Sequence, residues 1–277
     1  RQRSRGLTSR MTERLDVLDN PRSTRVGNVA GLSRRSARQR HRQFLVEGPQ
    51  AVRELVSHAP GLVRDVYVTD AVAARERATV SRARAAGLYL HRVTAEVAVA
   101  MSPDAQGILA VATMPPPPGL EVLEGARLAV LLPRVSDPGN AGTLIRIADA
   151  AGAAAVVACH GSVEVTSPKV VRATAGSLFH LPGGTGVSFA DAVGAARAAG
   201  LQVIGADPAS PHSVFGLRDR LGAPTAWVFG HEAHGLSAPE RDLCDLLAAI
   251  PIHGRAESLN VAAAAAVCLY ASAESLD

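Results

Sequence analysis

Residues 127–160, RLAVLLPRVSDPGNAGTLIRIADAAGAAAVVACH, decide the fold. The apolar run RLAVLLPRV predicts a buried strand, SDPGNAG a loop, TLIRIADAAG a helix and AAVVACH a second strand. Two further strands are expected at LQVIGAD (201–207) and AWVFG (226–230). Strands that alternate with helices imply a parallel sheet covered on both faces. The sequence therefore predicts an α/β fold for this part of the chain.

The rest of the C-terminal part continues the alternation. The segment AAIPIHG (248–254) is expected to be a strand. Helices are expected over SPKVVRATAGSLF (167–179) with Ser167 as its cap, FADAVGAARAAG (189–200), APERDLCDLL (238–247) and a long terminal segment (258–276).

The segment MPPPPG (114–119) marks a domain boundary, because four successive prolines cannot continue a helix or a central strand. Before it, strands are expected at FLVEG (44–48), VRDVYVTD (63–70), LYLHRV (88–93) and GILAVATM (107–114). Helices are expected at 31–43, 49–59, 71–86 and 95–101. We therefore expect a flexible arm (1–19), a small α/β domain (20–113), the proline linker (114–119) and a larger domain (120–277).

Charge is distributed unevenly between the two halves of the 277-residue chain. Residues 1–118 hold 19 arginines and 10 acidic residues, a net charge of +9, whereas residues 119–277 carry −5. A basic half joined to an acidic half favours contact between the first half and a polyanion such as nucleic acid. The alternative is a solvated basic surface without a partner.

Other classes of protein are disfavoured by what the sequence lacks. The three cysteines are far apart and in apolar contexts, so neither a disulfide framework nor a metal site is expected. No apolar run reaches membrane-spanning length and no segment resembles a secretory signal, so a cytoplasmic location is expected. Nucleotide-binding glycine motifs and the esterase elbow are also missing.

Three loops after expected strands carry polar residues and glycines, at a place where open α/β sheets bind ligands. They are NAGTLIR (140–146), GHEAHGL (230–236) and IPIHGRAESLNV (250–261). Each has a simpler explanation, since Asn140 could cap a helix and Arg146 could be an exposed helical arginine. The histidines of GHEAHGL are three residues apart, which fails the zinc-protease spacing.

Taken together and in this order, the three loops resemble the signature motifs of the SpoU (TrmH-like) family of RNA ribose 2′-O-methyltransferases, in the SPOUT superfamily. FLVEG, the arginine-rich segment before it and AQGILAV (105–111) resemble the substrate-binding domain found at the N-terminus of many members. The resemblance covers roughly residues 20–272.

The resemblance implies a parallel-sheet domain with a deep trefoil knot, a homodimer and S-adenosylmethionine as cofactor. It implies that backbone groups hold the cofactor at Ala206, Gly230, Ile250 and Leu259. The catalytic positions it implies are Asn140, Arg146, Glu232, Ser258 and Asn260. The resemblance makes the loop that contains His231 and His234 a cofactor-binding loop, in which neither histidine has a chemical role. No metal is expected.

Arg146 has two possible roles in methylating a ribose 2′-hydroxyl, an oxygen that must lose its proton and lie in line with the methyl group. In the family that the chain resembles, the corresponding arginine is assigned as the base or as the group that orients the target. A guanidinium is normally protonated, so the alternative is a forked clamp on an RNA phosphate. The sequence leaves both open.

RNA contacts are expected mainly from the segment RRSARQRHR (34–42). Its arginines would bind phosphates and give affinity without sequence choice. The expected contacts are Arg34, Arg35, Arg38, Arg40 and Arg42, joined by Arg172. Lys169 and Arg172 are expected near the RNA or the dimer interface.

The favoured function is therefore S-adenosylmethionine-dependent 2′-O-methylation of structured RNA, with ribosomal RNA of the 23S type ahead of others because of the additional N-terminal domain. A tRNA ribose methyltransferase and an antibiotic-resistance rRNA methylase stay open. So do a non-catalytic RNA-binding assembly factor and a metal hydrolase that uses His231, Glu232 and His234.

Overall fold

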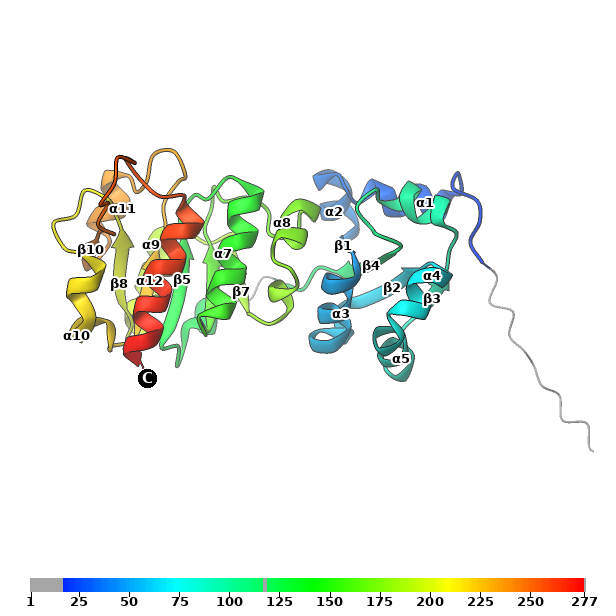
Figure 1. Ribbon diagram of the computed structural model, residues 1–277, viewed down its shortest axis with the longest axis horizontal. Coiled ribbons are helices and arrows are strands. Elements are labelled where there is room, and N and C mark those ends of the chain that lie inside the picture. The colour runs from blue at the N-terminus through cyan, green and yellow to red at the C-terminus, as the bar shows by residue number, and fades with distance from the viewer. Residues whose placement is uncertain (1–16, 117–118, 277) are drawn as a thin grey trace, which may run out of the picture.

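The computed structural model describes residues 17–116 and 119–276, and these build two sheets of different size (Figure 1). Most of the arm expected at residues 1–19 lies outside the described residues. Leu18 already belongs to the small domain, because its backbone N–H donates to Arg92 O at 2.9 Å and its carbonyl accepts from Thr94 N–H at 3.1 Å. The folded chain thus begins before residue 19.

The small domain is a four-stranded mixed sheet in the order β1-β4-β2-β3, in which only β2 and β3 run parallel. Its elements are α1 (Thr24–Gly31), α2 (Arg35–His41), β1 (Gln43–Glu47), α3 (Pro49–His58), the 3-10 turn η1 (Pro60–Leu62), β2 (Val63–Val68), α4 (Asp70–Arg75), α5 (Arg77–Ala85), β3 (Leu90–Arg92), α6 (Ala95–Met101) and β4 (Ile108–Thr113). The expected α/β character and all four expected strands are confirmed.

Two of the expected helices differ from the structure. Of the helix expected over 31–43 only α2 forms, separated by a break at residues 32–34 from α1, which was not expected. The Arg38 guanidinium folds back onto the carbonyls of Leu32 and Ser33, at 3.0 and 2.7 Å, and so stabilises the break. The helix expected over 71–86 divides at Glu76, which lies between α4 and α5.

The large domain is a six-stranded sheet in the order β10-β8-β9-β5-β6-β7, and every neighbouring pair is parallel. Its elements are η2 (Leu120–Leu123), β5 (Leu128–Leu132), α7 (Pro138–Ala150), β6 (Ala155–Ala158), α8 (Pro168–Ala173), η3 (Ser177–Phe179), β7 (Gly183–Thr185), α9 (Phe189–Ala198), β8 (Gln202–Ala206), η4 (Val214–Leu217), α10 (Arg218–Leu221), β9 (Thr225–Val228), α11 (Ala238–Asp242), β10 (Leu246–Ala248) and α12 (Val261–Leu276). The predicted parallel α/β architecture is confirmed.

Two apolar layers cover the faces of the large sheet. One contains side chains of α7 and α12 packed around Trp227, whose indole N–H donates to Ser272 Oγ at 2.8 Å. The other contains side chains of α9 and the segment after α11. Within the described part of the chain, none of the helices combines the length and the apolar character that crossing a membrane requires.

Several expected boundaries in the large domain are wrong. Helix α7 begins at Pro138, because Asp137 caps it by accepting a hydrogen bond from Asn140 N–H. Strand β10 ends at Ala248, so the strand expected over 248–254 is mostly irregular loop. Helix α12 begins at Val261, which leaves Ser258 and Leu259 in that loop, and α11 ends at Asp242.

The two domains meet in a contact that we call the seam, formed by α2, β1 and α3 on one side and residues 164–180 on the other. Helix α8 stands between the two sheets in Figure 1 and packs against β1. Val171 of α8 is fully buried in the apolar cluster of the small domain, together with Phe44 and Val52. The large domain thus contributes to the core of the small one.

Candidate functional site

The residues that follow four neighbouring strands converge at one end of the large sheet, as expected for β10, β8, β9 and β5 running parallel. We call this the carboxyl edge, formed by residues 133–140, 206–214, 229–236 and 249–260. Backbone hydrogen bonds tie its loops together: Asp207 N–H donates to Ala248 O at 2.9 Å, and Ala249 N–H donates to His212 O at 2.8 Å. The three sequence motifs therefore share one site.

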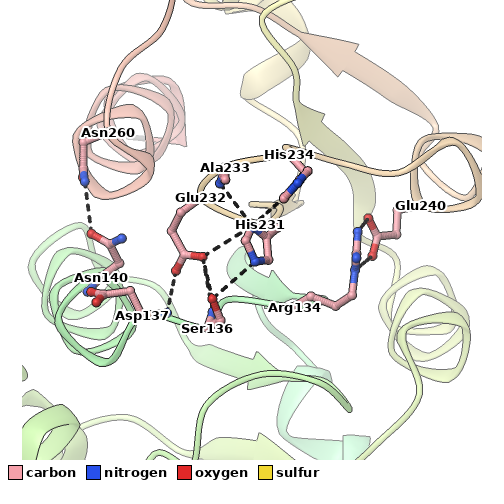
Figure 2. Close-up of polar contacts among 10 residues, drawn as sticks. All are labelled: Arg134, Ser136, Asp137, Asn140, His231, Glu232, Ala233, His234, Glu240 and Asn260. Carbon is pink, nitrogen blue, oxygen red and sulfur yellow. Dashed lines mark hydrogen bonds and ion pairs between the residues drawn. The ribbon is translucent and has the colours of Figure 1, made fainter.

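Glu232 links the loop after β9 to the loop after β5 (Figure 2). Its carboxylate accepts a hydrogen bond from Asp137 N–H at 2.9 Å, and from the N–H and Oγ of Ser136 at 3.3 and 3.2 Å. Partial burial alone would raise the pKa of this carboxyl, but the backbone N–H donors bring its pKa below the ordinary value. Glu232 is therefore held as an anion that fixes the loop before α7.

Asn140 joins the first and third motifs. Its Oδ1 accepts from Asn260 Nδ2 at 3.1 Å, across 120 residues of sequence (Figure 2). Asn260 Oδ1 accepts from Ala262 N–H at 2.9 Å, so Asn260 caps α12. The helix-cap explanation for Asn140 is wrong, since Asp137 caps α7 and leaves the Asn140 side chain free to bind Asn260.

Gly230 closes the loop of the second motif. His231 and Gly235 exchange backbone hydrogen bonds of 3.0 and 2.8 Å, which folds the loop back on itself. A Cβ atom on Gly230 would lie 2.4 Å from the carbonyl carbon of Gly235, far inside van der Waals contact. Only glycine therefore allows this close approach.

The two histidines of this loop face each other, with Nδ1 atoms 3.3 Å apart, and His231 Nδ1 also accepts from Ala233 N–H at 3.1 Å. The Glu232 carboxylate binds Ser136 and Asp137, and its Oε2 lies 3.9 Å from His231 Nδ1 (Figure 2). Within the described part of the chain, His231, Glu232 and His234 do not bring their ligand atoms close enough together to hold a metal ion. The geometry therefore gives no support to the metal-hydrolase alternative.

Arg146 lies on the outward face of α7, opposite the buried side chains of Ala141, Leu144 and Ala148. Its side chain is exposed and forms no hydrogen bond or ion pair with the described residues of its own chain. It stands six residues, or about 9 Å along the helix axis, from Asn140. One copy of the chain thus leaves the Arg146 guanidinium free to bind another molecule.

The expected cofactor positions lie at the same edge. Ala206 ends β8 beside Ala248 of β10, Ile250 follows β10, and Leu259 is 42% exposed in the loop before α12. Within the described chain, the backbone N–H groups of residues 252–260 form no hydrogen bonds to other parts of the protein. A run of free backbone donors beside an exposed apolar side chain fits a ligand with both polar and apolar parts.

Two of the expected RNA contacts require correction. Arg38 is only 3% exposed, and its guanidinium forms a forked pair with Glu164 at 2.9 and 2.8 Å. Arg172 pairs with the buried Glu47 and with Asp104. Both arginines connect the domains across the seam, so the Arg38 guanidinium is not free to contact a phosphate, and Arg172 is already paired with two carboxylates.

The remaining arginines of the segment, Arg34, Arg35, Arg40 and Arg42, are exposed on or beside α2. Lys169 is exposed on α8, across a cleft of about 750 Å³ that Arg35 also lines. The same cleft reaches Ser136 and Pro138 of the carboxyl edge. It therefore leads from the basic surface to the loop that Glu232 holds.

Sequence reasoning missed the residues that support this edge. Ser136 and Asp137 bind Glu232, and Arg134 forms a forked pair with Glu240 at 2.7 and 3.1 Å (Figure 2). Two local signals were present: the Asp-Pro pair at 137–138 indicates a helix start, and Ser237 with Glu240 forms a capping box.

A sequence model of the SpoU rRNA methylase family matches residues 127–270, which contain every strand of the large sheet and all three motif loops. The chain belongs to the SpoU rRNA methylase family. This confirms the resemblance inferred from the three motifs.

Members of the SpoU family resemble the chain over nearly its full length. The 23S rRNA (guanosine(2553)-2′-O)-methyltransferase RlmP of Bacillus subtilis is 32% identical, covering 91% of this chain and 97% of that protein. The 23S rRNA (uridine(2479)-2′-O)-methyltransferase of Streptomyces viridochromogenes is 34% identical, covering 86% and 85%. The crystal structure of the SpoU methyltransferase AviRb from S. viridochromogenes has a TM-score of 0.80 at 31% identity, covering 92% and 98%; a second structure of AviRb contains AdoMet. The similarity therefore includes the small domain as well as the family domain.

Proposed function

We propose that this chain transfers a methyl group from S-adenosylmethionine to a ribose 2′-hydroxyl of ribosomal RNA of the 23S type. The observation that carries the proposal is the meeting of all three SpoU motifs at one edge, through the Asn140–Asn260 and Glu232–Asp137 hydrogen bonds. Relatives that share both domains carry the name of 23S rRNA 2′-O-methyltransferase, which supports this substrate class.

The carboxyl edge suits S-adenosylmethionine. Ala206, Gly230, Ile250 and Leu259 would hold it through backbone groups, and the free N–H donors of residues 252–260 are available for the same purpose. Bound there, it would supply an electrophilic methyl group for the ribose oxygen, and Arg146, if it acts as the base, would take the hydroxyl proton. The backbone contacts support the expected knot. Residues 248–249 form backbone hydrogen bonds with the loop 207–214, and the chain then returns as α12, which packs beside α7.

Arg146 would act on the RNA rather than on the cofactor. It projects outward from α7, and all four expected cofactor positions lie in other parts of the chain. Its forked donors suit a phosphate or a ribose oxygen. Asn140 and Asn260 would hold the ends of α7 and α12 in place, and Glu232 would fix the loop beneath the target. The exposed Ser258 would orient the ribose or the loop itself.

The outward face of α7 and α12 suits a second copy of the chain. Residues 261–273 of α12 carry no charged side chain, yet Tyr270 is 49% exposed and Ala263 is exposed. An uncharged, partly apolar helix face of this kind is typical of a dimer interface. Arg146 is exposed on α7, which packs against α12, so a dimer through these two helices would bring it near the partner. Ala263→Glu should give a monomer in light scattering, while Ala78→Glu on α5 leaves the dimer intact.

The small domain would bind the RNA backbone. Arg34, Arg35, Arg40 and Arg42 offer exposed positive charge, and the cleft between Arg35 and Lys169 leads towards the carboxyl edge. Phosphate contacts of this kind position a nucleic acid without reading its sequence.

The test uses the purified full chain, methyl-labelled S-adenosylmethionine and three RNAs: 23S rRNA, 16S rRNA and bulk tRNA, each free of 2′-O-methyl groups. We expect label in 23S rRNA alone, with a gap in its alkaline cleavage ladder, because alkaline cleavage needs the free 2′-hydroxyl. Label in tRNA instead would overturn the substrate class. Cofactor binding without transfer to any RNA would favour the non-catalytic assembly factor.

A further inference from the structure

A group of metal-ligating side chains stands at the seam, outside the carboxyl edge. Glu54 and His58 lie one turn apart on α3 of the small domain, and His180 follows η3 of the large domain. The Nε2 atoms of His58 and His180 lie 3.4 and 3.3 Å from the same oxygen of Glu54. The three potential ligand atoms all lie within 4.8 Å of one another, from side chains that are partly exposed.

The His180 ring is oriented by a second carboxylate. Its Nδ1 lies 2.8 Å from Asp149 Oδ2, and a carboxylate can only accept this hydrogen bond, so Nδ1 carries the proton. Nε2 faces Glu54 Oε2 at 3.3 Å; without a metal it donates a hydrogen bond to that oxygen, and a metal ion bound there would take the place of the Nε2 proton. A carboxylate behind a histidine is the arrangement that fixes the tautomer of metal-binding histidines.

We propose that Glu54, His58 and His180 bind a divalent transition metal ion of the Zn²⁺ type. Zinc bonds of about 2.0–2.2 Å in tetrahedral geometry place neighbouring ligand atoms about 3.3–3.5 Å apart, which matches the two separations to the Glu54 oxygen. Two imidazoles and one carboxylate favour zinc over magnesium or calcium, which prefer oxygen ligands. The fourth position faces solvent, since the His58 side chain is 53% exposed.

Such an ion would join the two domains, because its ligands come from both sides of the seam. It would also be connected through Asp149 to α7, the helix that carries Arg146. The expectation that the chain uses no metal would then apply to the carboxyl edge only. The competing explanation is a simple ion-pair network, in which Arg53, 3.2 Å from Glu54, neutralises the carboxylate without any metal.

The test is a Zn²⁺ titration of the metal-stripped full chain in competition with a chromophoric chelator. We expect one Zn²⁺ ion per chain, an affinity at least about tenfold lower in His58→Ala, and a loss of about 10–100-fold in Asp149→Asn, which removes only the carboxylate behind His180. His41→Ala, which removes an exposed histidine of α2, serves as the matched control and should keep the wild-type affinity.

Thermal unfolding gives an independent measurement, since a ligand that binds only the folded state raises the unfolding temperature. Zn²⁺ should raise the unfolding temperature of the wild type and of His41→Ala but not that of His58→Ala, and Mg²⁺ should raise none. If His58→Ala fails to fold, His58→Gln replaces it. A wild-type chain that takes up no stoichiometric Zn²⁺, or a His58 variant that binds as well as the wild type, would overturn the proposal in favour of the ion-pair network.

Discussion

The seam and the carboxyl edge are both rich in polar side chains, but they use them in opposite ways. At the seam, arginines are matched with carboxylates, and Arg38 is nearly inaccessible to solvent. At the carboxyl edge, residues 253–260 are exposed and their backbone N–H groups lack partners within the described chain, as does the Arg146 guanidinium farther along α7. The difference teaches that an arginine is available to bind another molecule only when its own fold leaves the guanidinium unsatisfied.

The first prediction breaks the carboxyl edge at Arg146. Arg146→Ala should lower single-turnover methyl transfer by about 10²–10³-fold, the effect typical of removing one donor aimed at a transition state. S-adenosylmethionine affinity should stay within about twofold, because the cofactor is expected to rest on other loops. The unfolding free energy should change by less than about 0.5 kcal/mol, since the side chain is exposed.

Arg218→Ala, which removes an exposed arginine of α10, is the matched control and should transfer methyl groups normally. Arg146→Lys distinguishes the two proposed roles: a base would retain some activity that rises with pH, whereas a forked clamp would be poorly replaced at every pH. Near-normal transfer by Arg146→Ala would exclude both roles.

The second prediction breaks the seam at Glu164. Glu164→Gln leaves the Arg38 guanidinium buried without its counter-ion, which should lower the unfolding free energy by about 2–3 kcal/mol. Urea unfolding measures this, and S-adenosylmethionine affinity of the folded protein should be unchanged. Adding Arg38→Met should recover part of the loss, because an apolar side chain needs no counter-ion. A single variant as stable as the wild type would show that the pair does not hold the seam.

The same pair predicts a dependence on pH. Burial alone would raise the pKa of the Glu164 carboxyl, but the Arg38 guanidinium brings that pKa below the ordinary value. The folded pKa is therefore lower than the unfolded one, so the stabilisation is present above the unfolded pKa and is lost as the pH falls through the folded pKa. The acid side of the stability profile should accordingly be flatter in Glu164→Gln.

The third prediction concerns two helical glycines. Gly142 of α7 faces α8, where an added Cβ would lie 2.4 Å from Ala173 Cβ and 2.7 Å from Val170 O. Gly142→Ala should therefore destabilise the protein by about 1–3 kcal/mol. Gly194 of α9 has open space around it, so Gly194→Ala should stabilise by about 0.5–1 kcal/mol. Thermal unfolding of both variants checks the contrast, and equal effects would contradict the close α7–α8 packing.

The fourth prediction concerns the exposed arginines of the α2 segment, of which Arg35 also lies 3.5 Å from Glu164 and Arg42 donates to Pro115 O at 3.4 Å. Replacing Arg34, Arg35, Arg40 and Arg42 with Gln should reduce the slope of log affinity for 23S rRNA against log salt by up to about 3, since each phosphate contact contributes about 0.7–0.9. The control changes Arg75, Arg77, Arg82 and Arg84 to Gln on α4 and α5, with the same loss of charge. Equal slopes for the two variants would mean that net charge, not the α2 surface, binds the RNA.

The sequence predicted the parallel sheet and the meeting of the three loops, because both follow from local periodicity and from the geometry of parallel strands. It failed where a long-range contact decides the outcome. Arg38 looks like its neighbours in RRSARQRHR, and only its partner Glu164, 126 residues away, shows that it is buried. The pairing of Asn260 with Asn140, 120 residues away, likewise lies beyond any local pattern, although the cap that Asn260 forms on α12 is local.

The most direct test of the central claim is a map of 2′-O-methyl sites in the total RNA of cells with the gene, without it, and without it but carrying Arg146→Ala. The account predicts one 23S rRNA site that disappears on deletion, returns with the wild-type gene and stays absent with Arg146→Ala although that protein is folded and present. An unchanged map after deletion, or a site restored by Arg146→Ala, would contradict it.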